Sequence, residues 1–136
     1  MDHSAYLFVY GSLLKGQNNK MADLLSIYSE FLGEGFFNGK LYLVSWFPGA
    51  VLSDNSSDKV YGHIFKLNNE SKVLSVLDDY EGFGPGYDEP YLFRRELNTV
   101  NLKQGSQVES WVYLYNLPVR KLQRIPDGNY LNFKSQ

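Results

Sequence analysis

The chain contains no cysteine, so disulfide bonds, a thiolate nucleophile and cysteine-ligated zinc are all excluded. Histidine is nearly absent as well, because His3 and His63 are the only two in 136 residues. Two isolated imidazoles are too few for a histidine-ligated metal centre. We therefore expect no metal site, and we interpret His63, which lies within a predicted strand, as a hydrogen-bonded structural residue.

An excess of charge of one sign is missing too. The 13 Lys and Arg residues nearly balance the 15 Asp and Glu residues, giving a net charge of -2 and a pI near 5.6. This balance argues against binding to the phosphate backbone of nucleic acids. No apolar run is long enough to cross a bilayer, and the N-terminus carries an acid and leads into an apolar run that is too short for a signal peptide. We expect a cytoplasmic, soluble protein with no nucleic-acid or membrane partner, and its oligomeric state is open.

Hydrophobic and aromatic side chains, in contrast, are plentiful. They make up 43% and 16% of the sequence, and the aromatic share favours β-structure. The length fits a single domain, residues 1–136, with a substantial core. Apolar patterns predict strands at residues 6–10, 35–44, 50–52, 59–67, 91–102 and 107–115, with a hairpin at 103–106 and an irregular segment after Pro118. On residues 59–67 the alternation places Tyr61, His63, Phe65 and Leu67 on one face.

Two amphipathic helices interrupt these strands. The first carries Met21, Leu24, Leu25 and Tyr28 on one face, with Asn18 or Asn19 as its N-cap and Gly33 as its stop. The second begins at Asn68 or Asn69 and carries Val73, Val76, Leu77 and Tyr80 at helical spacing. Strands with two inserted helices are typical of an α+β fold, built as a small mixed β-barrel with flanking helices or as a curled sheet.

The stretch from Tyr6 to Gly16 has the clearest local pattern. Its apolar run predicts a buried strand that ends at Gly11, where the missing Cβ allows a sharp turn or a close approach. The residues Gly11-Ser12-Leu13 can then present consecutive backbone N–H groups to an anion or an oxyanion. A simple structural turn is the alternative interpretation.

Glu81 is the strongest candidate for chemistry. It follows Leu77 by four residues and Val73 by eight, so it shares the face that the second helix buries. It also lies at the helix C-terminus, where the macrodipole disfavours negative charge, and Asp78 and Asp79 add more. Burial, dipole and neighbours all predict a raised pKa, toward the range of a general acid or base near neutral pH.

Other assignments compete with this hypothesis. Arg95 lies on one strand face between Phe93 and Leu97, so it is predicted to neutralise Glu81 in a structural ion pair. Carboxylate pairs for glycoside hydrolysis are conceivable among Asp78, Asp79, Glu81, Asp88 and Glu89. A Ser12 nucleophile lacks the G-x-S-x-G context, and Gly11 to Lys15 lacks the spacing of a phosphate-binding P-loop.

Four segments together resemble the γ-glutamylcyclotransferase-like (AIG2-like) family, in the family's order and over nearly the whole chain. They are Phe8-Val9-Tyr10-Gly11-Ser12-Leu13, Val60-Tyr61-Gly62-His63-Ile64-Phe65, Leu77-Asp78-Asp79-Tyr80-Glu81-Gly82 and Phe93-Arg94-Arg95. The third resembles the segment that carries the family's catalytic glutamate. The short opening segment resembles the γ-glutamylamine cyclotransferase branch more than the glutathione-degrading branch.

The resemblance implies a mixed β-barrel flanked by helices and a substrate that is a small γ-glutamyl compound. It implies that Tyr10, Gly11, Ser12 and Leu13 bind the γ-glutamyl group through backbone amides. It further implies cleavage by intramolecular cyclisation to 5-oxoproline and a free amine, with Glu81 as general acid and base and with no cofactor. A non-catalytic binding domain that keeps the same pocket, with Glu81 paired to Arg95, is the alternative.

Overall fold

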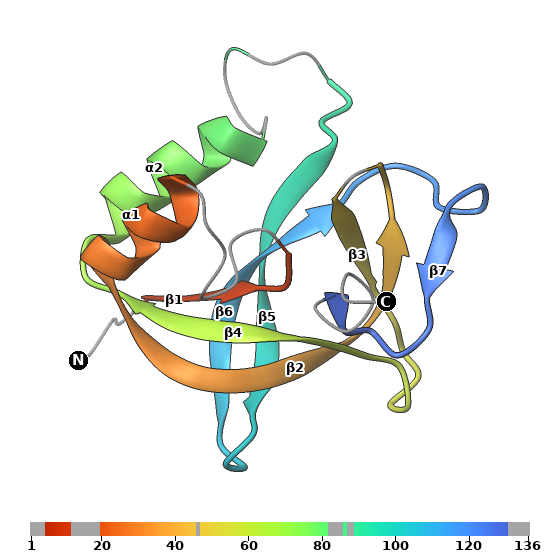
Figure 1. The fold of residues 1–136 in the computed structure, drawn as a ribbon, viewed down its shortest axis with the longest axis horizontal. Helices are drawn as coiled ribbons and strands as arrows, with labels where there is room; N and C mark the ends of the chain where they lie inside the picture. Colours follow the sequence, from red (N-terminus) through yellow and green to blue (C-terminus); the bar gives the residue numbers. More distant parts are fainter. Residues whose placement is uncertain (1–4, 12–19, 46, 82–85, 87–88, 131–136) are drawn as a thin grey trace.

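The computed structural model describes residues 5–11, 20–45, 47–81, 86 and 89–130. Within these residues, no helix is long and apolar enough to cross a membrane. The elements, in chain order, are β1 (Ala5–Val9), α1 (Lys20–Tyr28), β2 (Ser29–Leu43), β3 (Pro48–Leu52), β4 (Lys59–Leu67), α2 (Glu70–Glu81), β5 (Phe93–Leu102), β6 (Gln107–Tyr115) and β7 (Gln123–Ile125) (Figure 1).

Five of the strands close into a barrel in the order β2-β4-β1-β6-β5. Pairing of β2 with β5 completes the ring through two residue pairs, Gly35 with Leu102 and Phe36 with Asn101. Strands β1 and β6 are parallel and the other neighbours in the ring are antiparallel, so the barrel is mixed. A Cβ on Gly35 would lie 2.3 Å from the Asn101 carbonyl oxygen, so the ring closes where β2 has no side chain. The predicted α+β fold with a small mixed barrel is confirmed.

Strand β2 belongs to two sheets because it is 15 residues long. Its first part pairs with β4. Its last part, Gly39 to Leu43, pairs with β3 on one side, and the last three of these residues, Leu41 to Leu43, pair with β7 on the other. The prediction of an irregular segment after Pro118 was wrong at β7, because a strand of three residues is too short to show a period.

Apolar side chains form two clusters, one inside the barrel and one between the barrel and the helices. Phe8, Phe37, Ile64, Val112 and Leu114 are among those inside. The outer cluster includes Leu25 of α1, Val73 and Leu77 of α2, and Phe65 and Leu67 of β4. The predicted row of Tyr61, His63, Phe65 and Leu67 therefore lies on the outer face of β4, and its last two members pack in the layer that includes the helices.

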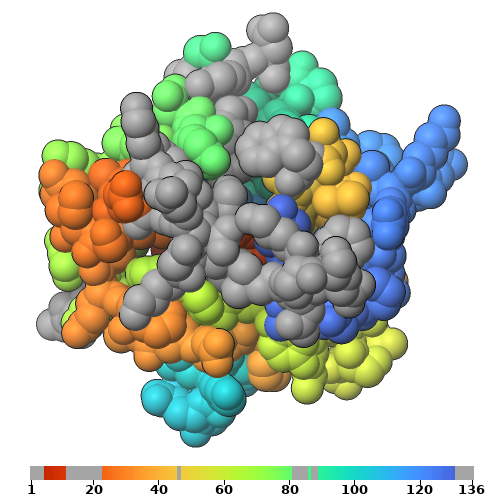
Figure 2. Space-filling model, in the orientation of Figure 1, coloured from red at the N-terminus to blue at the C-terminus, as the bar shows by residue number. Residues whose placement is uncertain are grey.

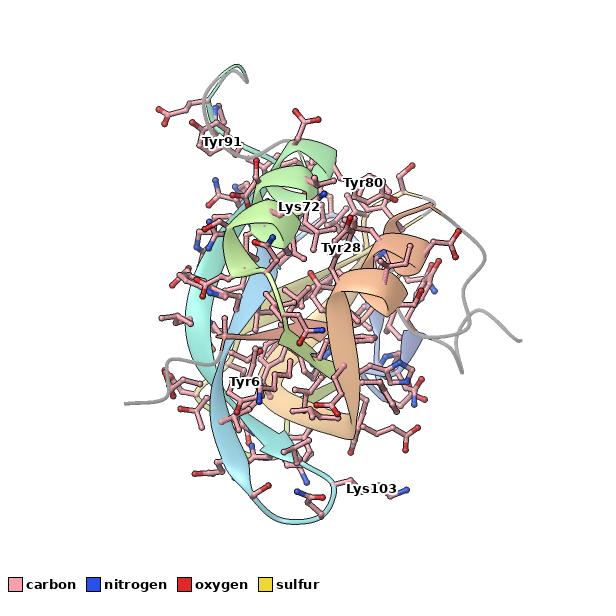
Figure 3. The ribbon with its side chains drawn as sticks, turned by 90° about the vertical axis from the view of Figure 1, so that its left-hand side faces the viewer. Tyr6, Tyr28, Lys72, Tyr80, Tyr91 and Lys103 are labelled. Atoms are coloured by element: carbon pink, nitrogen blue, oxygen red, sulfur yellow. The ribbon has the colours of Figure 1, made fainter. Side chains whose placement is uncertain are left out.

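The two helices pack side by side on one flank of the barrel (Figure 1). Figure 3 shows Lys72 of α2 and Tyr28 of α1 facing one another, with 3.0 Å between the Lys72 Nζ and the Tyr28 hydroxyl oxygen. On the space-filling surface, α1 and α2 occupy one side of the molecule and the segment with β7 the other (Figure 2).

The boundaries of both helices differ from their prediction. Helix α1 ends at Tyr28 and not at Gly33, because Ser29 to Phe31 pair with β4 instead of continuing the helix. The Ser29 hydroxyl donates to the Leu25 carbonyl and so caps the end of α1. Helix α2 uses Asn69 as its N-cap, since the Asn69 side-chain oxygen accepts the Lys72 N–H at 3.3 Å.

The buried face of α2 is also turned slightly from the predicted one. Val73, Leu74 and Leu77 are buried, whereas Tyr80 is 44% exposed. This rotation moves the centre of the buried face toward Leu74, and with it toward Asp78, which follows Leu74 by four residues.

Candidate functional site

One end of the barrel brings together the segments that the sequence singles out. Strands β1 and β6 run parallel, so their carboxyl ends lie at the same end of the barrel. Strand β5 is antiparallel to β6 and therefore begins there, with Phe93 opposite Tyr115. Leu77 of α2 shares a cluster with Val9, Phe93 and Tyr115, so the C-terminal half of α2 packs toward this end.

Tyr10 directly follows β1 and is held by two hydrogen bonds. Its ring is 6% exposed and belongs to the cluster inside the barrel. The hydroxyl donates to the Tyr113 carbonyl at 2.5 Å and accepts the Ala50 N–H at 3.1 Å. The phenol therefore ties the end of β1 to β6 and β3, and the backbone of Tyr10 is what remains for the predicted binding loop.

Gly11 follows where the chain approaches β3. A Cβ at this position would lie 2.9 Å from the Cγ of Pro48, closer than real side chains come. The approach therefore requires glycine, as the sequence pattern predicted for a close backbone contact. The other two predicted binding residues, Ser12 and Leu13, lie outside the described residues.

Glu81 is the last residue of α2, which extends as far as the sequence predicted. Its position follows Leu77 by four residues and Leu74 by seven, and both of these are buried. The Glu81 position therefore lies on the helix face that turns to the barrel. The Glu81 side chain itself is outside what the structure describes.

Arg95 pairs with Asp78, a partner that the sequence interpretation did not consider. The guanidinium Nε and Nη2 donate to the two Asp78 carboxylate oxygens at 2.8 and 3.0 Å. The guanidinium carbon Cζ of Arg95 lies 4.3 Å from the centre of the Trp111 ring. Burial on its own lowers the pKa of Arg95, but the hydrogen bonds and charge of Asp78 outweigh it, and the pKa is raised above its usual value.

Asp78 has a third partner, because the Tyr113 hydroxyl donates to the same carboxylate at 2.7 Å. The side chains of Asp78 and Arg95 are 21% and 18% exposed, so the group is largely enclosed. Sequence reasoning considered Asp78 only as a negative neighbour of Glu81 and a glycosidase candidate. The signal that would have found it is the spacing of four from Leu74, which the predicted helix face did not include.

The remaining acidic candidates offer no second carboxylate for glycoside hydrolysis in the part of the chain that is described. Asp79 and Glu89 are exposed, Asp88 is outside the described residues, and Asp78 is occupied by Arg95. No group of three His, Cys, Asp or Glu side chains converges there to hold a metal ion. His63 is buried against the Phe31 ring, with 5.2 Å between the ring centres.

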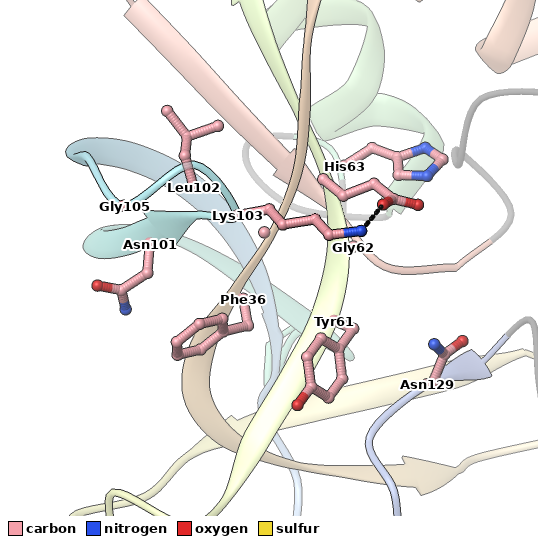
Figure 4. A pocket seen from close by; sticks show the side chains of 11 residues that line it. Phe36, Tyr61, Gly62, His63, Asn101, Leu102, Lys103, Gly105 and Asn129 are labelled. Carbon is pink, nitrogen blue, oxygen red and sulfur yellow. Dashed lines mark ion pairs between the residues drawn. The ribbon is translucent and has the colours of Figure 1, made fainter.

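A cavity of about 510 Å³ lies over β2, β4 and β5 (Figure 4). Phe36 and Tyr61 line it, and their ring centres are 6.0 Å apart. Glu34 and Lys103 form an ion pair of 3.6 Å at its rim, and both side chains are mostly exposed. Its lining residues include neither Gly11 nor a residue of α2, but one of them, His63, pairs with Val9 at the carboxyl end of β1.

Comparison with known proteins gives consistent matches over most of the chain. The sequence model of the family described as gamma-glutamyl cyclotransferase, AIG2-like, matches residues 7–132. A gamma-glutamylcyclotransferase family protein of Citrobacter rodentium is 33% identical over 129 residues, which are 93% of this chain and 95% of the relative. A gamma-L-glutamyl-butirosin B gamma-glutamyl cyclotransferase of Niallia circulans is 36% identical over 115 residues, 81% of this chain and 66% of that protein.

A solved structure of an AIG2-like protein from Mus musculus has the same fold. The two superpose with a TM-score of 0.68 at 26% sequence identity, covering 88% of this chain and 82% of the other.

Proposed function

The chain belongs to the gamma-glutamyl cyclotransferase, AIG2-like family, and from this premise we propose that it cleaves a γ-glutamyl amide or amine by intramolecular cyclisation. The products are 5-oxoproline and a free amine or amino acid. The observation that carries the proposal is topological. The end of β1, with its glycine turn, and the C-terminal half of α2, which ends at Glu81, pack toward the same end of the barrel.

The reaction needs one proton carrier and a place for a developing negative charge. The α-amine of the γ-glutamyl group attacks its own γ-carbonyl carbon, a new C–N bond closes the five-membered lactam, and the original amide C–N bond breaks. In this mechanism the Glu81 carboxylate takes a proton from the attacking nitrogen and returns it to the leaving nitrogen. No atom is oxidised or reduced, so the chemistry is complete without a redox partner.

The γ-carbonyl oxygen becomes negatively charged as the amine attacks. Backbone N–H groups are suited to that charge because they are fixed donors that need no reorganisation. We assign this role to the loop from Tyr10 to Leu13, whose first residue is held by the hydroxyl bonds to Ala50 and Tyr113. The close approach of Gly11 to Pro48 supports a rigid start for this loop.

The first test is release of 5-oxoproline from a panel of γ-glutamyl amines, γ-glutamyl dipeptides and glutathione. We expect Glu81→Gln to fold like the wild type and to lose on the order of a hundredfold or more in kcat on the accepted substrate. Asp79→Asn is the matched control, because it removes the same charge from an exposed position of the same helix. Full activity of Glu81→Gln would contradict the assignment of the base.

Measurements of 5-oxoproline binding, and not of protein stability, distinguish the enzyme from the non-catalytic alternative. Arg95 already has Asp78 as its partner, so Glu81→Gln does not leave the guanidinium unpaired. A protein that binds 5-oxoproline but releases none from any substrate would be a binding domain with a retained pocket. A protein that neither binds nor releases it would contradict both versions.

A further inference from the structure

We propose that Asp78, Arg95 and Tyr113 form a positioning unit that orients the last turn of α2, and with it Glu81, relative to the loop that begins at Gly11. The inference rests on the proposed function and adds to it three residues in a positioning role. These three residues come from α2, β5 and β6, so the unit connects the helix to two adjacent barrel strands.

The orientation of the Asp78 carboxylate is fixed by its hydrogen bonds. The two parallel bonds from Arg95 Nε and Nη2 fix the plane of the Asp78 carboxylate, and the Tyr113 hydroxyl adds a third bond from another strand. Three donors from two strands leave Asp78 a single orientation. Arg95 is itself held flat against Trp111 at 4.3 Å.

Asp78 and Glu81 lie close to one another along the helix. Asp78 precedes Glu81 by three residues, so the two Cα atoms are separated by only about 4.5 Å along the helix axis. Restraint at Asp78 therefore acts on the turn that contains Glu81. Without such restraint a helix end frays, because its last carbonyls have no partners within the helix.

The last turn of α2 is also connected to the residues that precede Gly11. Tyr113 donates from its hydroxyl to Asp78 and accepts from Tyr10 at its carbonyl. Tyr10 in turn accepts the Ala50 N–H. Hydrogen bonds through Tyr113 of β6 thus join the end of α2 to Tyr10, the residue before Gly11. A shift of the helix end relative to Tyr10 must break at least one of these bonds.

Stability alone does not explain this choice of residues. A carboxylate near a helix C-terminus is opposed by the macrodipole, and the last turn of α2 has no basic residue to compensate. An enclosed ion pair contributes little more to stability than well-packed apolar side chains would, although it fixes geometry more strictly. The arrangement fits a requirement for orientation, since catalytic groups must be held within about 0.5 Å of the productive geometry.

The test compares Tyr113→Phe, which removes one oxygen atom, with Asp78→Asn, which removes the charge and keeps the shape. On the accepted γ-glutamyl substrate we expect kcat to fall about tenfold for Tyr113→Phe and by up to about a hundredfold for Asp78→Asn, with KM nearly unchanged. Arg95→Lys keeps the positive charge but loses the fork, so we expect it to resemble Asp78→Asn and not the wild type.

The decisive comparison places the same substitutions in a Glu81→Gln background. If the unit acts through Glu81, Tyr113→Phe and Asp78→Asn cause no further loss of the residual rate there. A general disturbance of the fold would lower the residual rate again by the same factor. Glu96→Gln is the control, because Glu96 pairs with Arg94 on the opposite face of β5 and both side chains are about 40% exposed.

The outcomes separate this inference from the proposed function. Wild-type kcat in Tyr113→Phe and Asp78→Asn, or an equal further loss in the Glu81→Gln background, would overturn the positioning role and leave the proposed function standing. A raised KM with unchanged kcat would do the same. Absence of 5-oxoproline release by the wild type from every substrate would overturn both. Tyr113→Phe keeps the test valid if Asp78→Asn fails to fold.

Discussion

At the scale of single residues, the most informative side chain is Tyr10. The family resemblance implied a role in binding through the backbone amide of Tyr10. The ring faces the barrel interior, and the hydroxyl is hydrogen-bonded to two backbone groups. The side chain thus acts on the site indirectly, by fixing where the chain leaves β1. Gly11 contributes by the absence of a side chain, since Pro48 occupies the space that a Cβ would need.

Tyr10→Phe should leave the buried Ala50 N–H and Tyr113 carbonyl without this partner. Unsatisfied buried polar groups of this kind destabilise by about 1–3 kcal/mol, so we expect a loss of that size in the free energy of unfolding, measured by urea denaturation. Tyr6→Phe is the matched control on the same strand. Its hydroxyl has no hydrogen-bond partner among the described residues, and its removal should change the free energy little. Equal losses in the free energy of unfolding for the two substitutions would contradict a stabilising role of the Tyr10 hydroxyl.

Residue-level prediction from the sequence succeeded where the signal was local. The buried opening strand, the close approach at Gly11 and the extent of α2 to Glu81 all follow from short-range spacing. The partnership of Arg95 with Asp78 was missed because Asp78 lies off the predicted helix face. The rotation of α2, set by how Leu74 packs, turns Asp78 toward Arg95.

At the scale of elements, β7 is a short strand that is stabilised by backbone pairing and by an ion pair. It pairs with β2 through three residues, and Arg124 within it donates to the Asp58 carboxylate at 2.9 Å. Ser53 donates to the other oxygen of Asp58 at 2.7 Å. The Ser53 hydroxyl and then Arg124 hold the pKa of Asp58 below its usual value of 3.8.

This interaction predicts a pH dependence of stability. A carboxyl group whose pKa is lowered in the folded state stabilises the fold above the unfolded pKa, and the contribution is lost as pH falls through the folded pKa. We therefore expect Asp58→Asn to be less stable than the wild type at neutral pH and the difference to shrink between about pH 5 and pH 2. Denaturation midpoints across that range measure it, with exposed Asp54→Asn as the control. A difference that stays constant with pH would contradict the ion pair.

Length alone did not decide how well an element was predicted, since the longest strand, β2, begins at Ser29 and not at residue 35. Strand β4 and strand β6 have the predicted bounds, and the hairpin between β5 and β6 is present, with Gly105 at a φ of 112°. The end of α1 was missed because residues 29 to 34 satisfy a helical pattern locally, whereas pairing with β4 is a long-range contact. Strand β7 gave no pattern at all.

At the scale of the whole molecule, the order of elements predicted the fold class but not the closure of the ring. The β2–β5 junction consists of two residue pairs that are more than sixty positions apart in the chain, and no local pattern marks it. The only trace in the sequence is Gly35, within an otherwise ordinary strand. Its role becomes visible once Asn101 is seen to lie against it.

Gly35→Ala should force this junction apart, because the new Cβ would lie 2.3 Å from the Asn101 carbonyl oxygen and 2.6 Å from the Ile64 Cδ1. We expect the free energy of unfolding to fall by about 3 kcal/mol or more, measured by chemical denaturation. Gly105→Ala is the comparison, since that glycine has a φ of 112° but nothing within 4 Å of the new Cβ. It should cost only about 1–2 kcal/mol. Similar losses for both would mean that backbone strain, and not crowding at the junction, limits the barrel.

The place of β1 in the ring also has a consequence for how the protein is made. Strand β1 is the first strand synthesised, yet it lies between β4 and β6, which are translated much later. Its parallel partner, β6, ends only at Tyr115, so nascent β1 must wait for most of the chain before both of its edges are satisfied. The barrel end that begins at Gly11 therefore acquires its final form only after β6 has been synthesised, although its first residues emerge early.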